Sequence, residues 1–384
     1  MIATTTRIQV ILCIVFFGLT ACSQTGGKAG SSNNHKQDKA MTYTDGKDYL
    51  LLKRFRVIDP SGFAQPVEAA SFLLPANWHM EGGVTWNTSR CLSDIVQFSA
   101  HALSPDKKYE LFVFPTTQFD WVNNQQMMYA LRTGGYGSGC TIAEPVDAAT
   151  YIQQQLPGLV NATAISATAI TSIEQQLKQQ AAQYSAPGYS IVPSVAEGKL
   201  QFADGSEGIA LCSISQIIQS MQGYDGSAIA HYQTAVNNRV VLKYPKGEAA
   251  NARNLLGTIQ SSVRVNTVWI NAIQTMFNNI RKMVQDETWK RIQISQQAQE
   301  EISNNIARSW EKRNENPDKS SEWFGQYIRG VETWTDEGGN KVELTSGYSN
   351  AWSKSDGTYL LTINPAFDPN VEMGDTENWK RLNK

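Results

Sequence analysis

The chain has 384 residues, of which 41% are hydrophobic, so it is long and apolar enough to build two or three folded units. Only 18% of the residues are charged, and the formal net charge is −2. A total so close to zero, without any dense run of Lys or Arg, argues against a nucleic-acid partner.

The first 22 residues have the three parts of a secretory signal. Arg7 supplies a positive charge, an apolar segment covers residues 8–19, and two small residues precede Cys22. The apolar segment is shorter than the ~20 residues that a membrane-spanning helix needs, which favours a cleaved signal. Leu-Thr-Ala-Cys at 19–22 resembles the lipobox of bacterial lipoproteins. In that family the cysteine thiol receives a diacylglycerol and, after cleavage, its new amino group is acylated.

This resemblance implies that residues 1–22 are a lipoprotein signal and that Cys22 is the lipidation site. The mature chain then has 384 − 21 = 363 residues and is held at a membrane by its acyl chains. The alternative is an ordinary secretory signal, cut elsewhere, with a chance cysteine at position 22.

Residues 23–44 are expected to be a flexible tether. Ser23 to Ala40 contain no aromatic residue and no apolar residue larger than alanine, so this segment cannot bury enough surface to order itself. In proteobacterial lipoproteins, Asp directly after the lipidated cysteine resembles an inner-membrane retention signal. Ser23 therefore favours the periplasmic face of the outer membrane, if the host is Gram-negative.

The mature chain keeps three cysteines besides Cys22, and a cell-envelope location permits disulfides. We favour a pair between Cys91 and Cys140, because both lie near turn-rich segments. Cys212 lies in an apolar run and is expected to be a buried small hydrophobe. Three free thiols are the alternative that the sequence leaves open.

Residues 45–265 alternate β-rich segments with a few helices. A turn at Ser104–Lys107 predicts one hairpin, and Asn237-Asn238 predicts a second, tight hairpin. The pattern predicts an α+β fold, an antiparallel sheet with helices packed on it. The predicted strands include 49–58, 69–74, 95–103, 109–114, 189–202 and 209–221, and the predicted helices include 174–184 and 249–263.

Phe72-Leu-Leu-Pro75-Ala-Asn-Trp78 resembles the Phe-x-x-Pro-x-x-Trp opening of PsbP-like α/β/α sandwiches. The strand pair followed by the 249–263 helix is similar to the end of that fold. The chain also resembles a group of uncharacterised bacterial lipoproteins that carry such a domain before a long helix. The resemblance covers the first two thirds of the mature chain and implies a non-catalytic binding or assembly factor.

Residues 266–316 carry the strongest helical pattern. Apolar residues recur every three or four positions from Ile270 to Val284, and Asn316-Pro317 ends the pattern. We expect a long helical connector that is exposed to solvent or bridges domains. A structural component that docks a partner through the 266–312 helix is the alternative.

Residues 317–384 are expected to form a small, Trp-rich β domain. A small sheet with few aliphatic residues needs large aromatic side chains to fill its core. The alternative is an aromatic surface that binds a glycan or a peptide, and exposed indoles would distinguish the two. The tryptophans in question are Trp323, Trp334, Trp352 and Trp379.

The usual catalytic and metal-binding signatures are absent from the sequence. There is no Gly-x-Ser-x-Gly, no P-loop, no His-Glu-x-x-His and no Cys-x-x-Cys, so we assign no catalytic residue, no metal and no cofactor. An envelope hydrolase that uses His79 or Cys140 is the alternative. The sequence as a whole predicts a membrane-anchored envelope lipoprotein that binds or assembles an envelope protein or a glycan.

Overall fold

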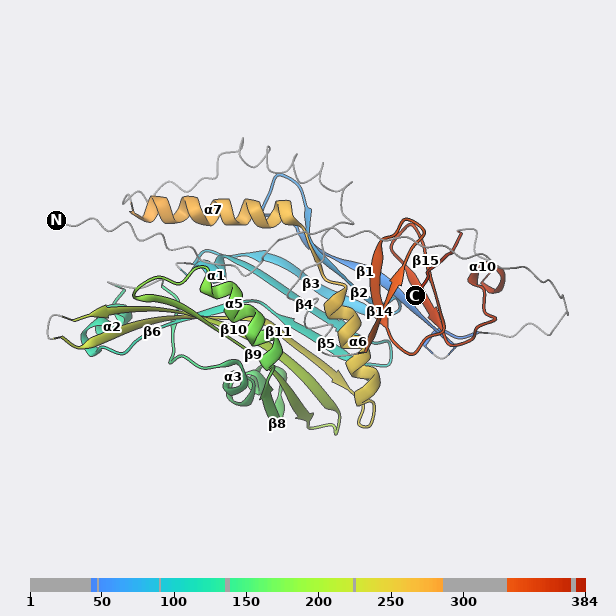
Figure 1. Ribbon diagram of the computed structural model, residues 1–384, viewed down its shortest axis with the longest axis horizontal. Coiled ribbons are helices and arrows are strands. Elements are labelled where there is room, and N and C mark those ends of the chain that lie inside the picture. The colour runs from blue at the N-terminus through green and yellow to red at the C-terminus, as the bar shows by residue number, and fades with distance from the viewer. Residues whose placement is uncertain are drawn as a thin grey trace.

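The computed structural model describes residues 43–285, apart from 47, 90, 135–138 and 224–225, and residues 330–384, apart from 374–377. Two mostly antiparallel sheets dominate this part of the chain (Figure 1). The lipobox, most of the tether and residues 286–329 lie outside the described residues.

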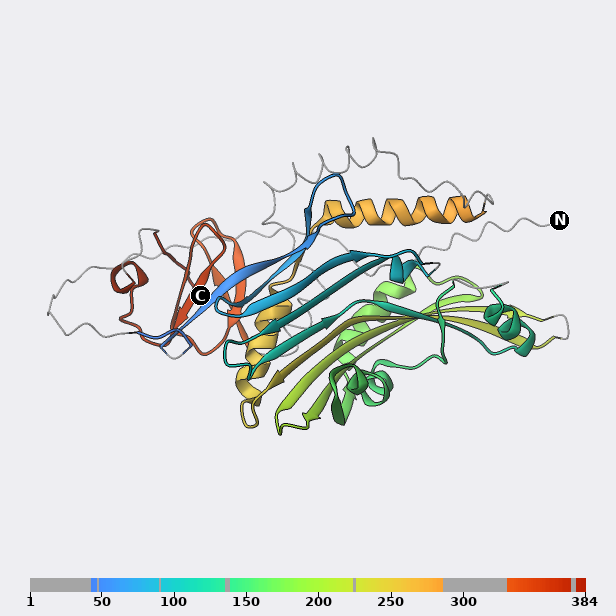
Figure 2. The same cartoon turned by 180° about the vertical axis from the view of Figure 1, so that it is seen from behind.

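The larger sheet has nine strands and is strongly curled (Figures 1 and 2). Its strands, in spatial order, are β3 (His79–Trp86), β4 (Val96–Leu103), β5 (Glu110–Phe114), β11 (Ala228–Tyr244), β10 (Glu207–Gln222), β9 (Tyr189–Phe202) and β8 (Ala162–Ala169). Off this path, β6 (Thr117–Val122) pairs with β11 beyond the end of β5, and β7 (Thr141–Ile142) pairs with β6.

The three longest strands, β9, β10 and β11, follow one another in the chain. Gly205, at φ +84°, makes the turn between β9 and β10 that the Asp-Gly sequence predicts. The predicted hairpin at Asn237-Asn238 is wrong, because β11 continues through both residues. Asn238 has φ +46°, and the register with β10 shifts between Leu211 and Ser213, so the asparagines lie at a bulge.

Helices cover both faces of the larger sheet. One face packs against α5 (Thr171–Ala182) and α6 (Ala249–Ser261), with Ile173 and Leu256 in the shared core. The opposite face packs against α3 (Ala148–Gln154) and α4 (Leu156–Val160). Figure 1 shows α5 in front of the sheet, and Figure 2 shows α3 from the other side.

The second sheet joins the two ends of the described chain. Its six strands, in spatial order, are β12 (Arg264–Val265), β2 (Val67–Pro75), β1 (Tyr49–Asp59), β16 (Tyr359–Thr362), β15 (Asn350–Ser353) and β17 (Lys380–Arg381). A hairpin of β13 (Val331–Thr335) and β14 (Lys341–Thr345) packs beside it, and Trp334 shares a core with Leu52 and Leu361.

Four further helices complete the described part of the structure. They are α1 (Leu92–Ile95), α2 (Gln125–Arg132) and α7 (Thr267–Gln285), with the short α10 (Pro369–Glu372) near the C-terminus. Asn266 caps α7, because its side-chain oxygen accepts hydrogen bonds from Val268 N at 3.1 Å and Trp269 N at 3.4 Å.

The predicted fold class, an α+β fold with a long helical connector and a small C-terminal β domain, is wrong. Among the described residues, strands take 46% and helices 23%, so the architecture is mostly antiparallel sheet with short helices packed on it. Within 266–316 the structure describes α7 as far as Gln285. Strands after residue 349 belong to the same sheet as β1 and β2. This sheet therefore contains residues from both 45–265 and 317–384. The division of the chain into 45–265, 266–316 and 317–384 stays a prediction.

Candidate functional site

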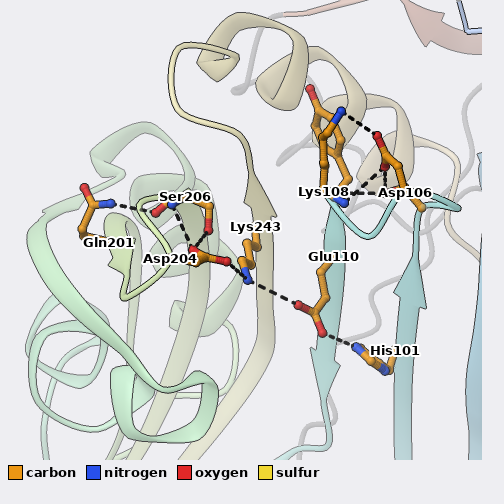
Figure 3. A network of polar contacts seen from close by, with 10 residues as sticks. His101, Asp106, Lys108, Glu110, Gln201, Asp204, Ser206 and Lys243 are labelled. Carbon is orange, nitrogen blue, oxygen red and sulfur yellow. Dashed lines mark hydrogen bonds and ion pairs between the residues drawn. The ribbon is translucent and has the colours of Figure 1, made fainter.

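A row of charged side chains crosses the larger sheet (Figure 3). Glu110 on β5 lies directly opposite Lys243 on β11, and its Oε2 is 4.0 Å from Lys243 Nζ. Its other oxygen, Oε1, is 2.7 Å from Nε2 of His101 on β4. Lys243 Nζ is also 2.7 Å from Asp204 Oδ2, in the turn between β9 and β10. The row therefore ties together strands that come from three separate parts of the sequence.

Each charge in this row already has a partner of opposite charge or a hydrogen-bond donor. Hydrogen bonds from Lys243, and then from the hydroxyl and backbone N–H of Ser206, hold the pKa of the Asp204 carboxyl below its usual range. Gln201 Nε2 donates to the Ser206 carbonyl at 2.8 Å, and the Lys243 ammonium lies 4.9 Å from the centre of the Phe202 ring.

The charged row can hold neighbouring strands together, but its contacts do not activate any side chain as a nucleophile. The His101 ring stacks on Phe112 at 4.9 Å and faces Glu110, while the Ser206 hydroxyl donates to Asp204. A Ser–His–Asp arrangement requires the hydroxyl to contact the imidazole, and these contacts point elsewhere.

A second acid–histidine pair is buried between β6 and β11. His231 is 3% exposed and Asp120 is fully buried, with His231 Nε2 3.6 Å from Asp120 Oδ1. Asp120 is also in register with Ile142 on β7, two residues after Cys140. The sequence alone does not identify Asp120 as the neighbour of His231, because the two residues are 111 positions apart (231 − 120).

A disulfide joins Cys91 and Cys140, the two cysteines that we paired from the sequence. Their Cα atoms are 4.5 Å apart, and both residues are buried. The bond connects the start of α1 to the start of β7. Cys212 is a free, fully buried thiol whose pKa burial raises to about 12, so it is not a nucleophile in the folded protein.

The hydrolase alternative relied on His79 and Cys140. The sulfur of Cys140 is held in the disulfide, so it offers no thiolate in this oxidised form. His79 lies at the start of β3 and contacts Glu81 at 3.2 Å, but both side chains are more than 70% exposed. Water screens such a pair, and nothing in this contact fixes the imidazole in one orientation.

A buried polar cluster surrounds Asp59, at the end of β1. This fully buried carboxylate accepts hydrogen bonds from the indole N–H of Trp86 on β3 at 2.9 Å and of Trp269 on α7 at 2.8 Å, and from Gly62 N at 2.8 Å. A Cβ at position 62 would overlap the Trp86 ring, so glycine is required there. The cluster binds α7 to the body of the protein and is structural, and sequence analysis missed it.

The described tryptophans of the C-terminal segment fill cores. Trp334, Trp352 and Trp379 are between 2% and 5% exposed. This burial agrees with the core-filling interpretation, whereas Trp323 lies outside the described residues. An aromatic glycan-binding platform therefore receives no support from these three indoles.

Cys22 lies outside the described residues, so lipidation there stays a prediction. Within the described ranges, no group of three or more His, Cys, Asp and Glu side chains is placed to hold a metal ion. None of the helices in those ranges combines the length and hydrophobicity needed to span a bilayer.

No protein-family model, curated protein or solved structure matches this chain. The resemblance to PsbP-like domains and to bacterial lipoproteins therefore rests on the sequence motifs alone.

Proposed function

We propose that this protein is a lipid-anchored lipoprotein of the bacterial cell envelope, and that it binds or assembles a partner while held at a membrane surface. In a Gram-negative host, Ser23 favours the periplasmic face of the outer membrane. The partner is an envelope protein or a glycan.

The Cys91–Cys140 disulfide is the observation that carries this proposal. Structural disulfides persist in oxidising compartments and are rare in the cytosol. The bond therefore supports export by an argument that does not depend on the lipobox. The lipobox then supplies what the disulfide cannot, a means of holding the exported chain at a membrane.

Binding is favoured over catalysis by what the polar side chains do. The charged row across the sheet is neutralised internally, and the Asp59 cluster fastens a helix. Docking through the 266–312 helix is the weaker alternative, because Ile270 and Ile273 at its start are already buried within the molecule.

Metabolic labelling tests the anchor directly. The full-length chain is expressed in a Gram-negative bacterium with alkyne-tagged palmitate, as wild type, as Cys22→Ser and as Cys13→Ser. Cys13 lies within the apolar part of the signal, so its substitution is the matched control. We expect label and membrane retention in the wild type and in Cys13→Ser, and loss of both in Cys22→Ser. Equal labelling or retention of Cys22→Ser contradicts the proposal.

A further inference from the structure

An exposed apolar surface lies where the described chain begins. We call it the apolar tip; it consists of Ile363, Pro365, Ala366 and Val371, all exposed. Val371 on α10 is 74% exposed and Ile363 is 61% exposed. Isolated exposed aliphatic residues need no explanation, whereas two large ones on one short segment, at positions 363 and 371, make that segment a candidate contact surface.

A packed base holds the apolar tip in place. Phe367, between Ile363 and Val371, is 2% exposed and shares a core with Trp352, Leu360 and Trp379. Asp368 caps α10 by accepting a hydrogen bond from Asn370 N at 2.9 Å. The exposed side chains are therefore displayed outward by an ordered segment.

The end of the tether lies against the same segment. Tyr43 is the first described residue, and its ring centre is 4.7 Å from that of Phe367. Its hydroxyl accepts a hydrogen bond from Asn364 Nδ2 at 3.4 Å. Because residues 23–42 alone separate Tyr43 from Cys22, the tip is the part of the described molecule that the predicted anchor keeps near the membrane.

We propose that the apolar tip rests on the lipid bilayer in which Cys22 is anchored; this rests on the proposed function. Residues 23–42 number 20, and a chain of that length with the composition of a flexible linker has a root-mean-square span of about 25 Å, which is short enough to keep the tip near the anchored end. Ile363 and Val371 enter the boundary between headgroups and acyl chains, as apolar side chains of peripheral proteins do.

The charges around the tip favour a zwitterionic lipid surface. Asp368 and Glu372 are on the same segment as Val371 and are exposed. Arg381 is also exposed and is linked to this segment, because its Nη2 donates to Asn350 Oδ1 at 2.6 Å and Asn350 Nδ2 donates to the Asn364 carbonyl at 3.4 Å. Charges of both signs give no strong attraction to anionic lipid.

Photo-crosslinking of the full-length chain in phosphatidylethanolamine and phosphatidylcholine vesicles tests this proposal. A p-benzoylphenylalanine replaces Val371 in one variant and Tyr129 in the control. Tyr129 is matched in exposure, at 71%, and lies on α2, at the opposite end of the molecule from α10 (Figure 1). We expect lipid adducts severalfold more abundant at 371 than at 129. Equal yields, or no lipid adduct at 371, overturn the proposal.

Palmitate labelling of the same samples separates the two claims. A chain that carries the label but forms no lipid adduct at 371 refutes the docking of the tip and leaves the anchor intact. A chain without the label refutes the anchor, and the tip proposal with it. As a second test, Ile363→Asp should lower the adduct yield at 371 severalfold, and an unchanged yield overturns the proposal.

Discussion

Replacing Asp59 by asparagine tests the contact that binds α7 to the sheets. Asp59 Oδ1 accepts from Gly62 N and Trp86 Nε1, and Oδ2 accepts from Trp269 Nε1 at 2.8 Å. Asparagine keeps one acceptor oxygen and places an amide N–H₂ where the other oxygen was. One indole N–H then faces a donor inside the protein.

The expected loss follows from the strength of these bonds. A hydrogen bond to a charged group contributes about 1.5–3 kcal/mol, and a donor left buried without an acceptor costs about 1–3 kcal/mol. We therefore expect Asp59→Asn to lower the free energy of unfolding by about 2–3 kcal/mol. Alanine removes both acceptors and should cost more.

Urea titration followed by circular dichroism measures the loss of unfolding free energy. A double-mutant cycle with Trp269→Phe shows how much of that loss comes from the hydrogen bond between Trp269 and Asp59. We expect a coupling energy of about 1–2 kcal/mol between positions 59 and 269. Glu337→Gln is the control, since that side chain is 72% exposed and its replacement should change stability by less than about 0.5 kcal/mol. A change in stability for Asp59→Asn as small as that for Glu337→Gln, or a coupling energy of zero, would show that the Asp59 carboxylate does not hold α7.

Three further outcomes are expected. Replacing both Cys91 and Cys140 by alanine should lower the free energy of unfolding by about 4 kcal/mol, because the disulfide closes a long loop. Urea titration without reductant measures this loss of stability. A loss below about 1 kcal/mol contradicts the prediction. Because the pKa of Asp204 is lower in the folded chain, its carboxylate adds a small stability above the unfolded pKa of about 3.9, and this contribution is lost as the pH falls through the folded pKa. The small difference in unfolding free energy between wild type and Asp204→Asn should therefore disappear in acid. A difference that persists in acid contradicts this role of Asp204. Iodoacetamide at pH 8 should modify Cys212 only after denaturation, as read by mass spectrometry, and rapid labelling of the folded chain would show that the thiol is not buried.

Local features of the fold were predictable because their signals are local. The Ser104–Lys107 turn connects β4 and β5 as predicted, with Lys107 N donating to Ser104 O at 2.9 Å. The strands at 189–202 and 209–221 are confirmed by β9 and β10, since a run of β-forming residues ended by Asp-Gly leaves little choice.

The errors come from interactions that join distant parts of the chain. Asn237-Asn238 has the composition of a turn, but β10 offers partners on both sides of it, so the strand continues through a bulge. Likewise, nothing near Tyr49 indicates that β1 pairs with β16, more than 300 positions away (359 − 52 = 307). The sequence therefore does not indicate that strands near the C-terminus join the sheet of β1 and β2.

The contacts of the candidate site could not be predicted for the same reason, because they join residues that are far apart in the sequence. The Asp59 carboxylate and the Trp269 indole are 210 positions apart, and neither residue has a local pattern that identifies a buried acceptor. The cysteine pair was accessible to reasoning because only a few pairings exist among three cysteines. The resemblance of Leu19–Cys22 to a lipobox is also a contiguous pattern in the sequence, and lipidation at Cys22 stays a prediction.

The most direct test of the central claim is the mass of the mature N-terminus. The protein is purified from bacterial membranes and its N-terminal proteolytic fragment is measured by mass spectrometry. We predict a fragment that begins at Cys22 and carries the added mass of a diacylglycerol and an amide-linked acyl chain. A fragment that begins at any other residue, or an unmodified Cys22, would contradict this prediction.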